Sequence, residues 1–174
     1  MTTATNWSRF LRLRLLPTAI SNLLLGVAVG SSLLPSPLLL ATTGAWVALL
    51  YLFGMGLNDL RDLSKDRRIS PGRPLPSGKI SPAHALGVLC AIFTSIILVG
   101  LWLPAAAQGI ALTALLWVLL YDLVLKEIPI LGPIAMGGVR GSIVMLGGTV
   151  AGGLPSSVLL PAVAVASYTA LVTH

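Results

Sequence analysis

The sequence predicts an all-α protein, a multi-pass bundle of transmembrane helices. Of its 174 residues, 56% are hydrophobic and only 9% are charged, whereas about 25% of the residues in a typical soluble domain are charged. The mean hydropathy is +0.95. The apolar residues form long uncharged runs rather than the short alternating blocks of membrane strands. We therefore expect one integral membrane domain over residues 1–174, embedded in a lipid bilayer.

Proline, glycine and polar residues divide the apolar runs into six expected helices. The uncharged run over residues 15–57 is too long for one span of about 20 residues, and Pro-Ser-Pro at 35–37 places a turn near its middle. The same pattern along the chain predicts helices at residues 15–34, 38–57, 82–103, 105–125, 130–150 and 154–173.

The first helix could instead be a secretory signal, because arginines precede it and small residues follow. Its apolar run exceeds a signal core of about 7–15 residues and leads directly into a second span. We therefore expect a retained helix.

The basic residues support this topology. They precede the first helix, fill the loop after the second and follow the fourth, while the intervening turns are uncharged. The positive-inside rule then places the N-terminus and the loop after the second helix on the cytoplasmic side. A basic rim accounts for the net charge of +6. No nucleic-acid partner is expected, since a soluble basic face with readout residues is missing from the sequence.

The polar segment after the second helix carries three of the five carboxylates, Asp59, Asp62 and Asp66. On a helix that continues beyond the second span, this spacing places all three on one face. Together with Asn58 they offer hard oxygen ligands, which suit Mg²⁺ bound with waters and substrate phosphate oxygens. The alternative is a solvated helix end whose acids pair with the neighbouring bases at 61, 65, 67 and 68. Such exposed pairs contribute only about 0–1 kcal/mol and do not require aligned acids.

The next segment is rich in proline, which stiffens a loop. We expect this loop to present Arg73 and Lys79 beside the acids.

Two stretches together carry a family resemblance. Asn-Asp-Leu-Arg-Asp-Leu-Ser-Lys-Asp at residues 58–66, followed by Arg-Pro-Leu-Pro-Ser-Gly at 73–78, resembles the first aspartate motif, NDxxDxxxD, and the arginine-proline loop of the UbiA superfamily of intramembrane prenyltransferases. The segments at 121–126 and 138–141 are similar to family segments after the fourth helix and within the fifth.

This resemblance implies a magnesium-dependent transfer of an isoprenyl group from a prenyl diphosphate to an aromatic or other lipid-soluble, hydrophobic acceptor. The metal would bridge the diphosphate and Asn58, Asp59, Asp62 and Asp66, the aspartates forming the catalytic motif. Diphosphate contacts would come from Arg73 and Lys126. Apolar helix walls would shield the allylic cation from water.

Arg140 and Tyr121 are further candidate substrate-binding residues. A charge within a predicted span costs about 2.5–3.5 kcal/mol, so Arg140 should face the bundle interior. We expect a site role there rather than a structural pairing with Asp122, which would equally satisfy the charge. Tyr121 is either a site residue or an anchor at the membrane interface.

The sequence departs from the resembled family in one respect. That family usually has roughly nine helices and a second aspartate motif, DxxxD, whereas Glu127 is the last carboxylate side chain here. The sequence is then a truncated piece of a prenyltransferase, a half-enzyme completed by a second chain that supplies the missing motif, or an inactive remnant that binds isoprenoid lipid. We expect the first, and expect the 174-residue chain alone to be inactive.

Two other function classes fit less well. A CDP-alcohol phosphotransferase also carries aspartates at cytoplasmic helix ends, but its motif begins Asp-Gly, and Asp59 is followed by Leu60. A transporter or lipid-binding scaffold would use the basic rim without requiring aligned acids.

Overall fold

The computed structural model describes residues 3–30, 34–152 and 156–173, and every regular element in these ranges is a helix. The α-helices are α1 (Thr3–Phe10), α2 (Leu16–Gly30), α3 (Pro37–Arg61), α4 (Leu63–Ile69), α5 (Pro82–Gly100), α6 (Ala105–Leu123), α7 (Leu131–Val150) and α8 (Ser156–Val172), with 3₁₀ turns at Leu13–Leu15 and Leu125–Glu127. The all-α prediction is confirmed.

The six expected helices correspond to α2, α3, α5, α6, α7 and α8, with ends that agree within a few residues. Two predicted stretches, 31–33 and 154–155, lie outside the described residues. The short helix α1 is an addition that the sequence did not predict, whereas α4 lies where the second expected helix was predicted to continue through the aspartate segment.

In the described part of the chain, four helical segments are long and apolar enough to cross a bilayer: Leu13–Gly30, Pro37–Arg61, Pro82–Gly100 and Ala105–Leu123. Helix α7 has 20 residues but is rich in glycine and contains Arg140. Helix α8 is apolar but has only 17 residues. A multi-pass helical bundle is thus confirmed, while six full spans remain a prediction.

The prolines that interrupt the apolar runs also start helices. Ser36 caps α3 by accepting a hydrogen bond from the Leu39 amide at 3.3 Å, and a proline occupies the first turn. Ser81 caps α5 in the same way through the His84 amide, at 3.2 Å. A side-chain oxygen before a proline-led first turn is a strong helix start, which is why these two boundaries were predictable.

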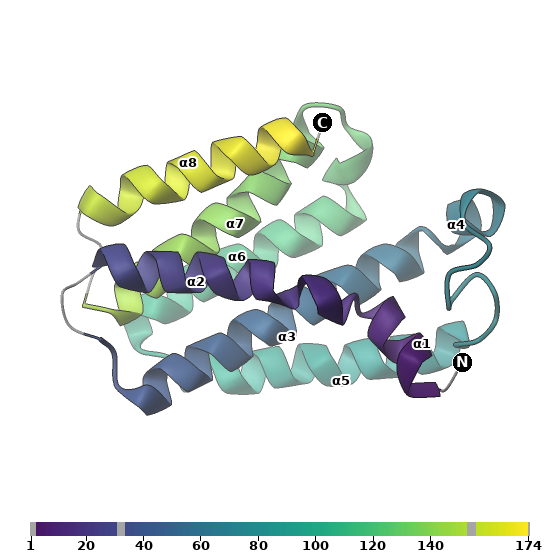
Figure 1. Ribbon diagram of the computed structural model, residues 1–174, viewed down its shortest axis with the longest axis horizontal. Coiled ribbons are helices and arrows are strands. Elements are labelled where there is room, and N and C mark those ends of the chain that lie inside the picture. Colours follow the sequence, from purple (N-terminus) through teal and green to yellow (C-terminus); the bar gives the residue numbers. More distant parts are fainter. Residues whose placement is uncertain (1–2, 31–33, 153–155, 174) are drawn as a thin grey trace.

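The long helices lie side by side along the long axis of the molecule (Figure 1). Helices α1 and α4 and the start of α5 lie at one end of the molecule, and the α6–α7 connection and the end of α8 point toward that end but lie nearer the middle (Figure 1). The end of α2, the start of α3, the end of α5, the start of α6, the end of α7 and the start of α8 lie at the other (Figure 1). The charged segments therefore lie toward one end of the bundle, as the predicted topology requires.

Helices α2, α7 and α8 approach each other backbone to backbone. A methyl group added at Gly26 of α2 would collide with the Val144 carbonyl oxygen of α7, and one at Gly147 would meet the Leu23 carbonyl oxygen. Gly137 similarly faces the backbone of α8. Small residues permit such close helix contacts in membranes. These contacts fix α7, which carries Arg140, against α2.

Candidate functional site

The aspartate segment consists of two helices with a break between them. Helix α3 ends at Arg61, α4 begins at Leu63, and Asp62 lies between them with φ −87° and ψ 5°. The backbone bonds still run through the break, since the Asp62 amide donates to the Asn58 carbonyl at 2.9 Å and the Asp66 amide to the Asp62 carbonyl at 2.8 Å. The uninterrupted helix expected from the sequence is therefore corrected to a broken one.

Asp59 and Asp66 are buried and share one arginine. The Nη1 atom of Arg73 lies 2.5 Å from Asp66 Oδ2 and 3.7 Å from Asp59 Oδ1. Arg12 Nη2 also donates to Asp59 Oδ1, at 2.5 Å. Two motif carboxylates are thus gathered around the guanidinium of the proline-rich loop.

Asp62 and Asn58 share a lysine. Lys126 Nζ lies 2.5 Å from Asp62 Oδ1 and 3.3 Å from Asn58 Oδ1. Lys126 belongs to the 3₁₀ turn after α6, so the fold brings it across 64 residues of sequence to reach Asp62. The structure therefore places Lys126, Asn58 and Asp62 together.

In the ion pairs that the structure describes, the three aspartates are paired with Arg12, Arg73 and Lys126. The neighbouring bases at 61, 65, 67 and 68 are not among those partners, contrary to the solvated-end alternative. All three partners lie on other elements, so the acids hold separate parts of the fold together.

Arg12 was not predicted as a site residue, because the sequence marks it only as a charge flanking the first helix. Arg12 follows α1 and adopts a left-handed backbone conformation, with φ 49° and ψ 44°. The Tyr51 hydroxyl of α3 donates to the Arg12 carbonyl oxygen at 2.9 Å. Nothing in the local pattern marks this contact, which depends on how α1 packs.

The proline-rich loop is held in place by an apolar cluster beneath α1. Phe10 of α1 packs in it with Leu75 and Ile80 of the loop and with Ala85 of α5. Arg73 directly precedes the buried residues Pro74 and Leu75 of this loop. The unpredicted α1 therefore helps to position the arginine that Asp59 and Asp66 share.

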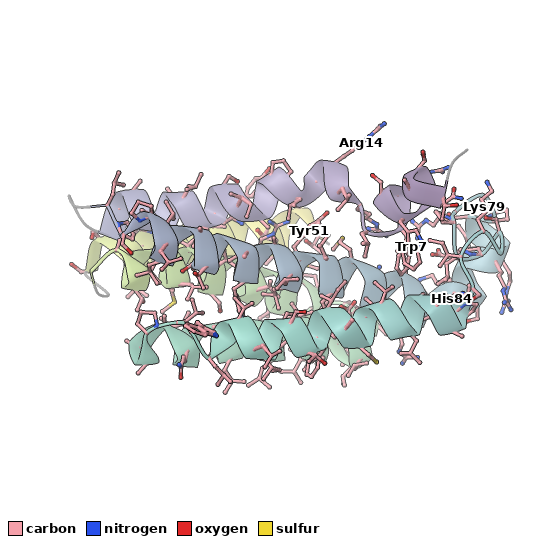
Figure 2. The ribbon with its side chains drawn as sticks, turned by 90° about the horizontal axis from the view of Figure 1, so that it is seen from below. Trp7, Arg14, Tyr51, Lys79 and His84 are labelled. Atoms are coloured by element: carbon pink, nitrogen blue, oxygen red, sulfur yellow. The ribbon has the colours of Figure 1, made fainter. Side chains whose placement is uncertain are left out.

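Lys79 does not lie where the sequence suggested. It is exposed at the end of the molecule that also carries Trp7 and His84 (Figure 2) and is absent from the described ion pairs. The loop therefore presents Arg73, but not Lys79, to the acids.

A cavity of about 130 Å³ lies among α2, α3, α6 and α7. Most of its lining is apolar, and it adjoins the aspartate segment through Asn58 and Arg12. Tyr51 contributes from inside the bundle, whereas Arg14 points away from it (Figure 2). The cavity places an apolar space directly beside the charged residues.

Arg140, Tyr121 and Asp122 all line this cavity. Arg140 Nη2 donates to Thr18 Oγ1 at 3.4 Å, and an Arg140–Asp122 pair is not among the described ion pairs. This arrangement favours a site position for Arg140 over the structural pairing. Tyr121 is half-buried in the cavity wall, which similarly favours a site position over an interfacial anchor.

The metal ligands expected from the sequence fit Mg²⁺ in kind but are not pre-assembled. Among the described residues, no three Asp, Glu, His or Cys side chains are grouped so as to hold a metal ion. The oxygen-only set of Asn58 and the three aspartates is the type that Mg²⁺ prefers. Arg73 and Lys126 each engage one oxygen of a carboxylate in the described pairs, and phosphate oxygens are suitable further partners for both side chains.

Comparison with known proteins identifies similar sequences. The chain is 36% identical over 126 residues to a digeranylgeranylglyceryl phosphate synthase of Methanoculleus marisnigri, covering 72% of this chain and 44% of the relative. It is 34% identical over 147 residues to the enzyme of that name from Methanococcoides burtonii, covering 79% and 52%. The chain thus spans about half the length of these curated relatives.

Solved structures share the fold. One from work on a digeranylgeranylglyceryl phosphate synthase in membranes has a TM-score of 0.84 at 24% identity, over 99% of this chain and 60% of the other. A UbiA homologue from Archaeoglobus fulgidus bound to GPP and Mg²⁺ has a TM-score of 0.80 at 17% identity, over 94% and 60%. The UbiA prenyltransferase family itself matches residues 15–174, and the chain therefore belongs to that family.

Proposed function

We propose that this site takes part in magnesium-dependent transfer of a prenyl group from a prenyl diphosphate to the hydroxyl group of a prenylated glyceryl phosphate within the membrane. The observation that carries the proposal is the cluster of oxygen ligands and bases beside an apolar cavity. The names of the relatives support the acceptor. The neighbour bound to GPP and Mg²⁺ supports the donor and the metal.

The charged residues would bind the donor's diphosphate. Arg73 and Lys126 hold carboxylates at 2.5 Å in the free site, and both can turn to diphosphate oxygens. Asn58, Asp59, Asp62 and Asp66 would hold the metal. When bound, Mg²⁺ supplies neutralisation of the charge on the leaving diphosphate.

The cavity would adjoin the reacting end of the donor. Apolar side chains such as Leu50, Val118 and Ile143 line it. Exclusion of water protects an allylic cation from hydrolysis and strengthens nearby electrostatic interactions. The cavity would thereby favour attack by the acceptor over attack by water.

We place the charged end of the bundle on the cytoplasmic side, by the positive-inside rule.

We also propose that residues 1–174 are part of one UbiA-like domain whose second aspartate motif comes from further sequence of the same protein or from a second chain. A half-domain that binds isoprenoid without turning it over is the second candidate. The pairing of every motif aspartate with a base inside this chain favours it.

The test compares Asp62→Asn with Glu127→Gln, an exposed carboxylate outside the cavity that serves as the matched control. Binding of geranyl diphosphate to the 174-residue protein is measured with and without Mg²⁺. We expect magnesium-dependent binding that Asp62→Asn weakens by about tenfold or more and that Glu127→Gln leaves unchanged.

Transfer of labelled prenyl to geranylgeranylglyceryl phosphate is then measured in lipid vesicles. Transfer would establish a catalytic chain, and binding without transfer would favour the half-domain. A donor affinity that changes neither with Mg²⁺ nor with Asp62→Asn would refute the proposed site.

A further inference from the structure

The burial of the Asp122 carboxylate is not explained by the packing around it. It lies one residue before the end of α6, is 3% exposed, and its Oδ1 atom has no hydrogen-bond partner. A buried polar atom without a partner costs free energy, and most such atoms in proteins are satisfied. A carboxylate that lacks any described hydrogen bond or ion pair, on a residue that lines a cavity, therefore points to a ligand.

The surroundings of Asp122 define what that ligand would meet. The same cavity is lined by Arg140 and Tyr51, with Val118 and Met136 among its apolar members. The guanidinium of Arg140 is directed to Thr18 and leaves Asp122 unpaired. The cavity thus combines a hydrogen-bond acceptor, a cation and an apolar wall, which suits a small phosphorylated group that also bears a hydroxyl.

The position of the cavity also fits the acceptor side of the reaction. Asn58 and Arg12 border it, and both contact charged partners at the aspartate segment. A hydroxyl bound at Asp122 would therefore approach a donor from the apolar side, opposite the diphosphate.

We propose that the Asp122 carboxylate binds the hydroxyl of the acceptor and takes its proton during transfer. The new bond joins the acceptor oxygen to the allylic carbon of the donor, the bond from that carbon to the diphosphate breaks, and diphosphate leaves with its electron pair. The hydroxyl proton passes to the Asp122 carboxylate. The inference rests on the proposed function for the identity of the acceptor.

Asp122 would also determine specificity. An acceptor without a hydroxyl would leave the carboxylate buried and unpaired, and sites built to bind a hydroxyl strongly reject analogues that lack it. The residue therefore selects hydroxyl-bearing acceptors over apolar ones of similar size.

The first experiment measures binding of two probes, geranylgeranylglyceryl phosphate and its methyl ether, in which the hydroxyl is blocked. We expect the 174-residue protein to prefer the hydroxyl probe by about tenfold or more. Asp122→Leu should abolish the preference, while Glu127→Gln should retain it. An unchanged preference in a folded Asp122→Leu protein would overturn the assignment.

The second variant is Asp122→Asn, which keeps the shape of the side chain and is therefore expected to fold. Its neutral oxygen accepts a weaker hydrogen bond than a carboxylate, so the preference should fall severalfold. Where the wild-type protein transfers prenyl, this variant should transfer about 100-fold more slowly with donor affinity unchanged. A variant with the full preference for the hydroxyl, or with wild-type transfer, would refute the role.

The two proposals fail separately in these measurements. A hydroxyl preference that depends on Asp122 in a protein without transfer activity would support the binding role and contradict catalysis by the chain. A transfer rate that stays the same when Asp122 is replaced would support the proposed function and overturn the role of Asp122.

Discussion

Arg12 occupies a backbone conformation that non-glycine residues seldom adopt. The Tyr51 hydroxyl holds its carbonyl at 2.9 Å while Asp59 holds its guanidinium at 2.5 Å. Backbone strain of this kind persists only where surrounding contacts enforce it. Tyr51 is therefore inferred to position Arg12 for the site.

Replacing Tyr51 by Phe should release the Arg12 carbonyl and lower the free energy of unfolding by about 1 kcal/mol, the usual contribution of one hydrogen bond. Affinity for geranyl diphosphate should fall as well, because the guanidinium beside Asp59 loses its fixed position. Thermal unfolding and donor binding test this. Tyr168→Phe, on an exposed residue of α8, is the control, and equal donor affinity in the two variants would contradict the positioning role.

The residues of the site differ in how predictable they were. The oxygen ligands and Arg73 come from one continuous segment, so their spacing could be recognised in the sequence. Lys126 was predicted from the family resemblance. Arg12, Tyr51 and Asp122 come from three separate helices or their ends. Their convergence on one cavity depends on tertiary packing, which residue spacing along the chain does not encode.

At the scale of helices, the contact between α2 and α7 is set by glycine. Gly26→Ala would place a methyl group against the Val144 carbonyl oxygen and force the two helices apart. We expect a loss of about 1–3 kcal/mol in the free energy of unfolding. Gly44→Ala, where an added methyl group meets nothing within 4 Å, should cost little. Thermal unfolding in detergent measures both, and equal melting temperatures would disprove the close contact.

The long helices were predictable because a span of the bilayer requires an apolar run of defined length. Helix α1 was not, because it has eight residues, several of them polar, and isolated helices of that length are unstable. It is stabilised by tertiary contacts, chiefly the burial of Phe10 against the loop. The break at Asp62 was equally hidden, since the spacing of the aspartates is compatible with a continuous helix.

For the molecule as a whole, ligand binding should raise stability. A ligand at about 100 times its dissociation constant stabilises the folded state by about 2.7 kcal/mol. Geranyl diphosphate with Mg²⁺ should therefore increase the melting temperature of the 174-residue protein, and a chelator should abolish the increase. Geraniol, which lacks the diphosphate, is the control. An equal increase with geraniol would show that the charged end of the bundle does not bind the donor.

The internal ion pairs of the aspartate segment also bear on whether the fold needs a metal ion. Three carboxylates gathered in one segment without basic partners would repel one another in the folded protein. Here Arg12, Arg73 and Lys126 already neutralise the three aspartates. The folded segment therefore does not depend on a bound metal ion to offset the repulsion among its three aspartates.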